Sequence, residues 1–242
     1  MGNGNAYKAH KTFLKQLQSK WNKSASEITV LDMGCGGGEF VVDLYNEGYN
    51  VFGYDLSIGT HQRTEEIKML KTHIGNELAD RIKLTDDERK IPFSSGSFDI
   101  IVSSAVLEHI KYVDDILFET HRVLREGGCL MASLPYKSSL MEQHIGIPLA
   151  HRFKQGRFRI SYIQTLKRCE KKKAIRWDKY LAEGCYYRYR REIKKVGLKY
   201  FEACKSEVNL LREIDTIPKI FKLPLIPTIC AYFYLDFLAF YK

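Results

Sequence analysis

The sequence lacks the paired cysteines of disulfide-rich domains and of zinc-binding modules. Six cysteines are scattered over 242 residues, with no CxxC pair and no regular spacing. We therefore expect reduced thiols in a reducing compartment, with neither a disulfide framework nor a metal site. The six residues are Cys35, Cys129, Cys169, Cys185, Cys204 and Cys230.

Long apolar runs are also missing. Residues 1–11 are polar with no apolar run behind them, so no signal peptide is expected. An apolar stretch over residues 226–241 contains Asp236 and falls short of the roughly 20 apolar residues that a membrane-spanning helix needs. We expect a buried helix and a final strand there, or alternatively a peripheral membrane contact through Ile229, Tyr232 and Phe233. The sequence predicts a cytoplasmic protein, either free or peripheral at the membrane.

Acidic residues are scarce between Arg152 and Lys199. This segment holds 17 Lys and Arg against four acidic residues, a net charge of +13, whereas the whole chain carries +9. The remainder of the chain is therefore mildly acidic. The segment is either a solvated surface that keeps the protein soluble, or a surface for an anionic partner such as a phosphorylated substrate, an acidic lipid headgroup or nucleic acid.

Short apolar runs alternate with helical spacing from residue 28 to residue 135, which is typical of βαβ units and a parallel sheet. After a leading helix within residues 1–27, strands are expected at 29–31, 50–54, 82–84, 98–103, 128–133, 197–201 and 235–241, and helices at 40–47, 60–77 and 113–124. Residues 136–196 are basic and aromatic, and they predict a mainly helical lid inserted before the last two strands. The whole chain, 1–242, is expected to form one domain.

Four glycines follow the first expected strand, in Val30-Leu-Asp-Met-Gly-Cys-Gly-Gly-Gly-Glu-Phe40. Such a turn lets a ligand approach bare backbone, and the amides at the start of the next helix face that ligand. A dinucleotide-binding fingerprint fails because Glu39 stands where its third glycine belongs. A phosphate-binding P-loop fails because no Gly-Lys-Ser/Thr follows.

The stretch Asp32-Met-Gly-Cys-Gly-Gly-Gly38 resembles motif I of class I S-adenosylmethionine-dependent methyltransferases. The resemblance implies a Rossmann-like, doubly wound α/β fold with a mostly parallel seven-stranded sheet, its last pair antiparallel, and S-adenosylmethionine as cofactor. It also implies that the backbone of Gly34, Cys35 and Gly36 runs alongside the methionine part of the cofactor, and that Asp32 holds its ammonium group.

Two further segments extend the resemblance toward the nucleoside. Asp55 ends the second expected strand, where an acid accepts hydrogen bonds from both ribose hydroxyls, and Leu56 follows it. Residues 87–99 resemble the D-x-x-x-L-P-F-x-x-x-S-F-D stretch of the family. That alignment places Asp87, with Glu88 beside it, at the adenine amino group, and Asp86 is the alternative.

Ile101-Val-Ser-Ser-Ala-Val-Leu-Glu-His-Ile110 resembles the fourth motif of the family. By this resemblance Ser103 lies along the cofactor, while Glu108 and His109 begin the next helix near the transferred methyl group.

The acceptor is less clearly encoded. The D/N-P-P-Y/F motif of nucleobase and amide N-methyltransferases and the Pro-Cys nucleophile of cytosine-C5 enzymes are both missing, which favours a small-molecule or glycan acceptor. Residues 134–153 resemble the E-x-H-x-G-x-P-x-x-H stretch of methyltransferases in polysaccharide or lipid-linked glycan synthesis. By that resemblance Glu142, His144 and His151 face the acceptor, and Tyr136 and Arg157 are further expected contacts.

A histidine suits removal of a hydroxyl proton because its ordinary pKa lies near 6.5. We rank the candidate bases His144, His109 and His151, with local hydrogen bonding inside the lid as the alternative role. The lid's cations are expected to hold a diphosphate-linked saccharide or acidic lipid headgroups; they include Arg157, Arg159, Arg168, Lys171–Lys173 and Arg188–Arg191.

The sequence therefore predicts an S-adenosylmethionine-dependent O-methyltransferase acting on a glycan or small polar metabolite. One alternative is an RNA-modifying methyltransferase whose basic segment grips phosphates, although nucleic acid is the less favoured partner. Another is a non-catalytic, cofactor-binding regulatory protein, because an intact cofactor motif does not prove turnover.

Overall fold

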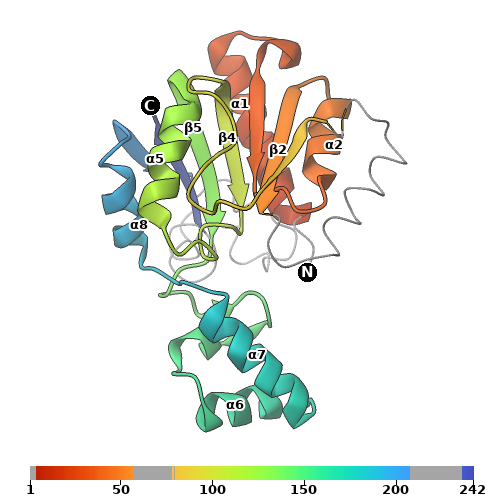
Figure 1. The fold of residues 1–242 in the computed structure, drawn as a ribbon, viewed down its shortest axis with the longest axis vertical. Helices are drawn as coiled ribbons and strands as arrows, with labels where there is room; N and C mark the ends of the chain where they lie inside the picture. The colour runs from red at the N-terminus through yellow and green to blue at the C-terminus, as the bar shows by residue number, and fades with distance from the viewer. Residues whose placement is uncertain (1–3, 57–77, 79, 208–235) are drawn as a thin grey trace, which may run out of the picture.

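The computed structural model describes residues 4–56, 78, 80–207 and 236–242 (Figure 1). Its helices are α1 (Gly4–Trp21), α2 (Glu39–Asn46), α5 (Val113–Val123), α6 (Arg157–Lys167), α7 (Lys171–Glu183) and α8 (Arg190–Gly197), with 3-10 turns η1 (Ala25–Glu27) and η2 (Ala150–Arg152). Its strands are β1 (Thr29–Met33), β2 (Asn50–Leu56), β3 (Ile82–Thr85), β4 (Phe98–Ser104), β5 (Leu124–Leu134), β6 (Met141–Glu142), β7 (Ile147–Pro148), β8 (Ala203–Ser206) and β9 (Asp236–Tyr241). The helix expected over residues 60–77 and the apolar residues 226–235 lie outside the described ranges.

Seven strands form one sheet in the order β3-β2-β1-β4-β5-β9-β8. The first five run parallel, with Leu31 of β1 beside Phe52 of β2 and Ile101 of β4. Strand β9 lies antiparallel between β5 and β8. The predicted mostly parallel, doubly wound α/β sheet with an antiparallel last pair is confirmed.

Helices cover both faces of this sheet (Figure 1). Neighbouring residues of β1 point to opposite faces and are both fully buried: Val30 packs with α1 and α2, while Leu31 packs with α5 and α8. A strand buried on both faces is apolar at nearly every position, which explains the continuous apolar runs in the sequence.

Between β5 and β8 the chain forms a small helical unit beyond one end of the sheet, at the bottom of Figure 1. We call residues 141–183 the insertion; it comprises the two-stranded β6–β7 pair, η2, α6 and α7. It has a core of its own, in which Ile147 and Ile163 pack with Ala174 and Leu181.

Three expectations about local structure are wrong. The strand expected at 197–201 is absent, because α8 continues to Gly197 and β8 begins only at Ala203. Gly197 ends that helix directly against Phe240, where an added Cβ would lie 2.1 Å from Cε1 of the ring. Helix α8 packs on the sheet with α5 rather than in the insertion. Residues 108 and 109 lie in a turn, since α5 starts at Val113.

Within the described ranges, every helix is too short or too polar to cross a membrane.

Candidate functional site

A cavity of about 250 Å³, which we call the cofactor cavity, opens at the carboxyl ends of β1, β2 and β4. Six of the nine residues predicted to bind the cofactor line it: Gly34, Gly36, Asp55, Leu56, Asp87 and Glu88. The other lining residues are Tyr54, Lys90, Ser104, Ala105, Val106, His109, Ile110 and Ile116. Ligands of open α/β sheets bind at this edge.

Gly34 brings bare backbone to the cavity. Its φ is +75°, a left-handed conformation that residues with a Cβ rarely adopt, and its amide donates a hydrogen bond to the Tyr54 carbonyl at 2.9 Å. An added Cβ would lie 2.4 Å from Cγ2 of Val106 across the cavity wall. Only glycine therefore permits this turn and leaves room for a ligand.

Asp55 is held rigidly at the end of β2. Its Oδ2 accepts a hydrogen bond from the Gly36 amide and its Oδ1 one from the Leu56 amide, each at 2.7 Å. A carboxylate oxygen has two lone pairs, and an acid at this place can accept hydrogen bonds from the two hydroxyls of a ribose.

The remaining three predicted residues lie behind the cavity lining. Cys35 and Ser103 are buried, and so is Asp32, whose Oδ2 has no hydrogen-bond partner among the residues that the structure describes. Burial raises the pKa of Asp32 to about 8, and the charge of Asp55 adds to the effect. A buried carboxylate without a partner fits a cationic ligand group such as the ammonium of the expected cofactor.

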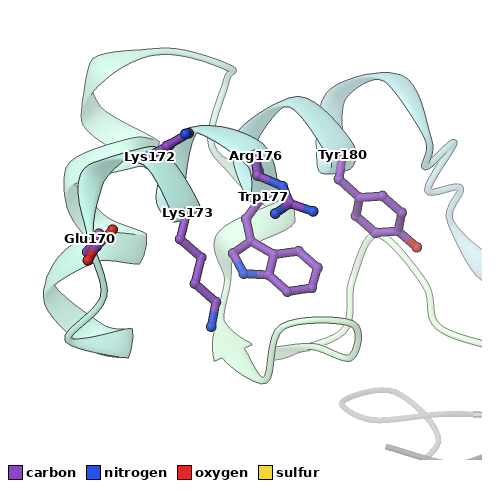
Figure 2. A pocket seen from close by; sticks show the side chains of 6 residues that line it. All are labelled: Glu170, Lys172, Lys173, Arg176, Trp177 and Tyr180. Carbon is purple, nitrogen blue, oxygen red and sulfur yellow. The ribbon is translucent and has the colours of Figure 1, made fainter.

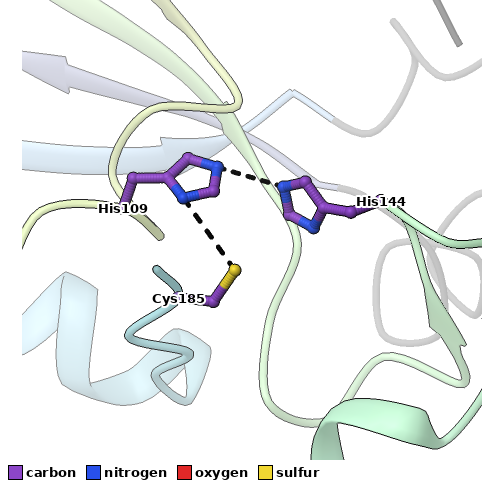
Figure 3. A group of neighbouring side chains, drawn as sticks. All are labelled: His109, His144 and Cys185. Carbon is purple, nitrogen blue, oxygen red and sulfur yellow. Dashed lines mark hydrogen bonds between the residues drawn. The ribbon is translucent and has the colours of Figure 1, made fainter. Parts of the chain in front are cut away.

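His109 joins this cavity to the insertion. Its Nε2 lies 3.0 Å from Nε2 of His144, and its Nδ1 donates a hydrogen bond to the Gly184 carbonyl at 2.5 Å. The thiol of Cys185 lies 3.9 Å from the same Nδ1. Figure 3 shows the two rings and the thiol turned toward one another from three separate segments; we call His109, His144 and Cys185 the histidine cluster.

Glu142 orients His144. Its side chain is fully buried, and Oε1 accepts a hydrogen bond from Nδ1 of His144 at 2.7 Å and another from the Tyr187 hydroxyl. The Ile145 amide donates to Oε2 at 2.8 Å. Burial opposes ionisation, but these hydrogen bonds outweigh it and lower the pKa of Glu142. Glu142 therefore positions His144. The prediction that Glu142 faces the acceptor is wrong, because its carboxylate is buried.

The other predicted catalytic and substrate residues lie elsewhere. Nε2 of His151 is 3.2 Å from the Lys137 carbonyl, and its ring packs against Tyr187. Tyr136 is 1% exposed and packs in the core between the sheet and α5, which replaces the expected acceptor contact. Arg157 is exposed at the start of α6.

A second hollow, of about 560 Å³, runs along α7 (Figure 2). We call it the insertion groove; its lining residues are Glu170, Lys172, Lys173, Arg176, Trp177 and Tyr180. Lys173 and Trp177 also line a smaller cavity of about 220 Å³, which reaches His144. The ring of Tyr180 lies 5.5 Å from that of His144 and 5.9 Å from that of Trp177. Cations and aromatic rings thus extend from the histidine cluster along α7.

Two arginines expected to bind phosphates are already engaged. Arg159 is buried, and its Nε bonds Oδ1 of Asp178 at 2.5 Å, which joins α6 to α7. Arg188 donates to four backbone carbonyls, those of Leu107, Ile110, Lys111 and Tyr186. These contacts use the guanidinium donors within the protein, so the prediction is wrong for both residues.

Several residues of this region were not predicted from the sequence. Cys185, Tyr180 and Trp177 reach it through the packing of α7, and Lys90 reaches the first cavity from the loop after β3. Cys185 shares no sequence motif of characteristic spacing with His109 or His144, so the sequence does not predict that they meet. Their signal in the sequence is weak, because Trp177 and Tyr180 are isolated aromatic residues of a basic segment and Cys185 only precedes the aromatic run at 186–189.

A family model described as a methyltransferase domain matches residues 6–197. Mitochondrial ubiquinone biosynthesis O-methyltransferase of Mus musculus is 31% identical over 122 residues, 49% of this chain and 31% of the mouse protein. The ubiquinone biosynthesis O-methyltransferase of Hydrogenovibrio crunogenus is 29% identical over 133 residues, 53% of this chain and 51% of that protein. The chain spans about a third to a half of the length of these curated relatives.

Among solved structures, a putative S-adenosylmethionine-dependent methyltransferase from Listeria monocytogenes superposes with a TM-score of 0.56 at 16% sequence identity. The match covers 100% of this chain and 99% of that one. At this identity the likeness shows a shared fold.

Proposed function

Since the chain belongs to the family of S-adenosylmethionine-dependent methyltransferases, with S-adenosylmethionine as its cofactor, we propose that it methylates a hydroxyl group of a glycan or small polar metabolite. The observation that carries the proposal is the position of His109. This side chain lines the cofactor cavity and also contacts His144 of the insertion.

Two kinds of observation support an oxygen atom as the methyl acceptor. Relatives from mouse and Hydrogenovibrio crunogenus are named O-methyltransferases of ubiquinone biosynthesis. In this chain, the imidazoles of the histidine cluster lie where the cofactor cavity meets the insertion, and removal of a hydroxyl proton requires a basic or charge-stabilising group at that place.

The insertion groove supports a polar, anionic acceptor. Lys172, Lys173 and Arg176 line it with a single acid, Glu170, which suits a phosphate or carboxylate group. The adjoining Trp177 and Tyr180 provide ring faces for stacking of a sugar. The acceptor's anionic part therefore lies along α7 and its hydroxyl at the histidine cluster.

Bound S-adenosylmethionine supplies an electrophilic methyl group, which passes to the acceptor oxygen as the sulfur–methyl bond breaks and S-adenosylhomocysteine is released. The chain's own residues hold and align the reactants: the backbone at Gly34 and the Asp55 carboxylate hold the cofactor, and the groove aligns the acceptor. The hydroxyl proton leaves at the histidine cluster. Of the predicted bases, His144 and His109 lie in this cluster and stay the candidates in that order, whereas His151 lies outside it.

The test is transfer of labelled methyl groups from S-adenosylmethionine into a cell extract that includes membranes. The extract is then separated into lipid-linked glycan, RNA and soluble-metabolite fractions. Label in the glycan or metabolite fraction supports the proposal, and entry into the membrane-bound fraction also supports action at the membrane face. Label in RNA alone overturns it in favour of an RNA-modifying enzyme, and cofactor binding without any transfer favours a regulatory protein.

The groove has a matched test on the same helix. Arg176→Glu should raise the KM for the acceptor about tenfold or more, because it places a negative charge where the anionic group lies. Lys179→Glu makes the same charge change at an exposed residue of α7 that pairs with Glu183, outside the groove, and should leave the KM within about twofold. Equal effects of both variants would contradict the assigned groove.

A further inference from the structure

The two histidines of the cluster meet in an unusual way. The Gly184 carbonyl can only accept a hydrogen bond, so Nδ1 of His109 carries a hydrogen. The Glu142 carboxylate likewise accepts from Nδ1 of His144. With both rings neutral, the lone pairs of the two Nε2 atoms point at each other across 3.0 Å, and either a proton on one Nε2 or a metal ion between them relieves the repulsion.

This arrangement matches the surroundings of metal-binding histidines. Such a histidine typically donates its second ring N–H to a carboxylate or a backbone carbonyl, which fixes the ring and makes the ligand nitrogen more basic. Glu142 and the Gly184 carbonyl play these parts here, and Glu142 is itself held by Tyr187 and the Ile145 amide.

A third ligand completes the set. Cys185, His109 and His144 each offer one ligand atom, and these atoms lie within 4.8 Å of one another (Figure 3). Zinc–nitrogen bonds of about 2.0–2.1 Å and zinc–sulfur bonds of about 2.3 Å place tetrahedral ligands roughly 3.3–3.7 Å apart. Binding of an ion therefore requires the two Nε2 atoms, now 3.0 Å apart, to separate by a few tenths of an ångström and the thiol to approach by about an ångström.

A second observation favours a positive charge at this place. Glu108, the residue before His109, is 2% exposed, and neither of its carboxylate oxygens has a hydrogen-bond partner on another described residue. It lies close enough to His144 and Glu142 to interact with both electrostatically. A buried carboxylate without a partner is costly unless a positive charge lies nearby.

We propose that His109, His144 and Cys185 bind a divalent zinc-type ion at the junction of the cofactor cavity and the insertion. Two imidazoles and a thiolate are ligands that select zinc over magnesium or calcium. Three protein ligands leave a fourth position open, as in catalytic zinc sites.

The proposal deepens the proposed function and rests on it only for the ion's role. The ion would supply Lewis-acid chemistry: an acceptor hydroxyl at the open position would lose its proton to water more readily and so become the nucleophile for the methyl carbon. The histidines then serve as ligands in place of proton acceptors. Binding of the ion itself needs neither acceptor nor cofactor, and cysteine coordination releases the thiol proton.

The experiment is titration of metal-free, reduced protein with Co²⁺ and with Zn²⁺, without acceptor. We expect one equivalent of each to bind, Zn²⁺ to displace Co²⁺, and the Co²⁺ form to show visible bands of tetrahedral coordination with a thiolate-to-cobalt charge-transfer band. Cys185→Ser should remove the charge-transfer band and weaken binding at least tenfold. Glu142→Gln, which weakens the support of His144 without removing a ligand, should weaken binding about 10–100-fold.

Cys204→Ser is the matched control, because it makes the same change in β8, outside the cluster, and should leave spectrum and affinity unchanged. Absence of stoichiometric binding, or a charge-transfer band that survives Cys185→Ser, overturns the site. Methyl transfer that continues undiminished with a chelator overturns the ion's catalytic role while the proposed function stands. Stoichiometric binding with no transfer to any polar acceptor supports the site and overturns the proposed function.

Discussion

The shape of the cofactor cavity depends on the absence of a side chain at Gly34, because a Cβ there would collide with Val106. Gly34→Ala combines a left-handed φ of +75° with a contact of 2.4 Å to the valine, so we expect a loss of about 2 kcal/mol or more in the free energy of unfolding. Cofactor affinity should fall at least tenfold. Denaturant unfolding and calorimetric titration measure the two effects.

Gly36 provides the control at the same turn. It also has a positive φ, of +55°, but an added Cβ would meet nothing within 4 Å. Gly36→Ala should therefore destabilise the protein by the conformational strain alone, less than Gly34→Ala. An equal loss would show that the contact with Val106 is unimportant.

The buried carboxyl of Asp32 makes the free energy of unfolding depend on pH. Its pKa is about 8 in the folded protein and near 3.8 when unfolded, so between these values the folded state binds a proton that the unfolded chain has released. Stability contributed by the protonated form is full below about pH 4 and is lost as the pH rises through about 8, by up to about 1.4 kcal/mol per unit.

Asp32→Asn isolates this effect. Without cofactor, the native protein should lose stability relative to the Asn variant when unfolding is measured at about pH 5 and then at about pH 8. Parallel pH profiles of the two proteins would show that Asp32 is ionised throughout this range in the folded state.

At the scale of elements, the insertion depends on one buried ion pair between α6 and α7. Arg159 and Asp178 are both nearly inaccessible to solvent, and Arg159 also donates to the carbonyls of Asp178 and Phe153. Arg159→Met leaves the Asp178 carboxylate buried without its partner, at an expected cost of about 3–5 kcal/mol to the insertion. Faster hydrogen exchange across α6 and α7 measures it.

Arg157→Met is the matched control, because Arg157 is exposed on the same helix two residues earlier. It should leave exchange in α6 and α7 unchanged. If Arg159→Met also released the strands of the sheet, the insertion would not be an independently stabilised unit.

At the scale of the whole molecule, the insertion is joined to the sheet through a short junction. Arg188 donates to the carbonyls of Leu107, Ile110 and Lys111, at 2.8–3.3 Å, and the Tyr186 amide donates to the Glu108 carbonyl at 2.6 Å. These bonds hold the turn that carries His109 against the segment that follows α7. The relative position of cofactor and acceptor therefore depends on the junction.

Arg188→Met should lower kcat/KM for the acceptor at least tenfold, because about 1 kcal/mol is lost for each of several hydrogen bonds. Cofactor affinity should change much less, since Gly34, Gly36 and Asp55 lie outside the junction. Arg191→Met, an exposed change nearby on α8, is the control for steady-state kinetics and cofactor titration. A kcat/KM unchanged by Arg188→Met would contradict a positioning role for the junction.

The amino-acid sequence by itself determined the sheet and the cofactor half of the candidate site. Apolar runs predicted every parallel strand, and the resemblance to motif I together with the acid at the end of the second strand pointed to Asp32, Gly34 and Asp55, of which the last two line the cavity. The physical reason is locality: a parallel sheet gathers the carboxyl ends of adjacent strands at one edge, so each position follows from its own strand.

Only the tertiary structure decided the acceptor half. His109, His144 and Cys185 come from segments 35 to 76 positions apart, and their meeting depends on how the insertion packs against the sheet. The same packing buried Tyr136 and engaged Arg188 in backbone hydrogen bonds. Whether a histidine, a cysteine or an arginine is free for chemistry depends on long-range packing, which residue type and spacing do not encode.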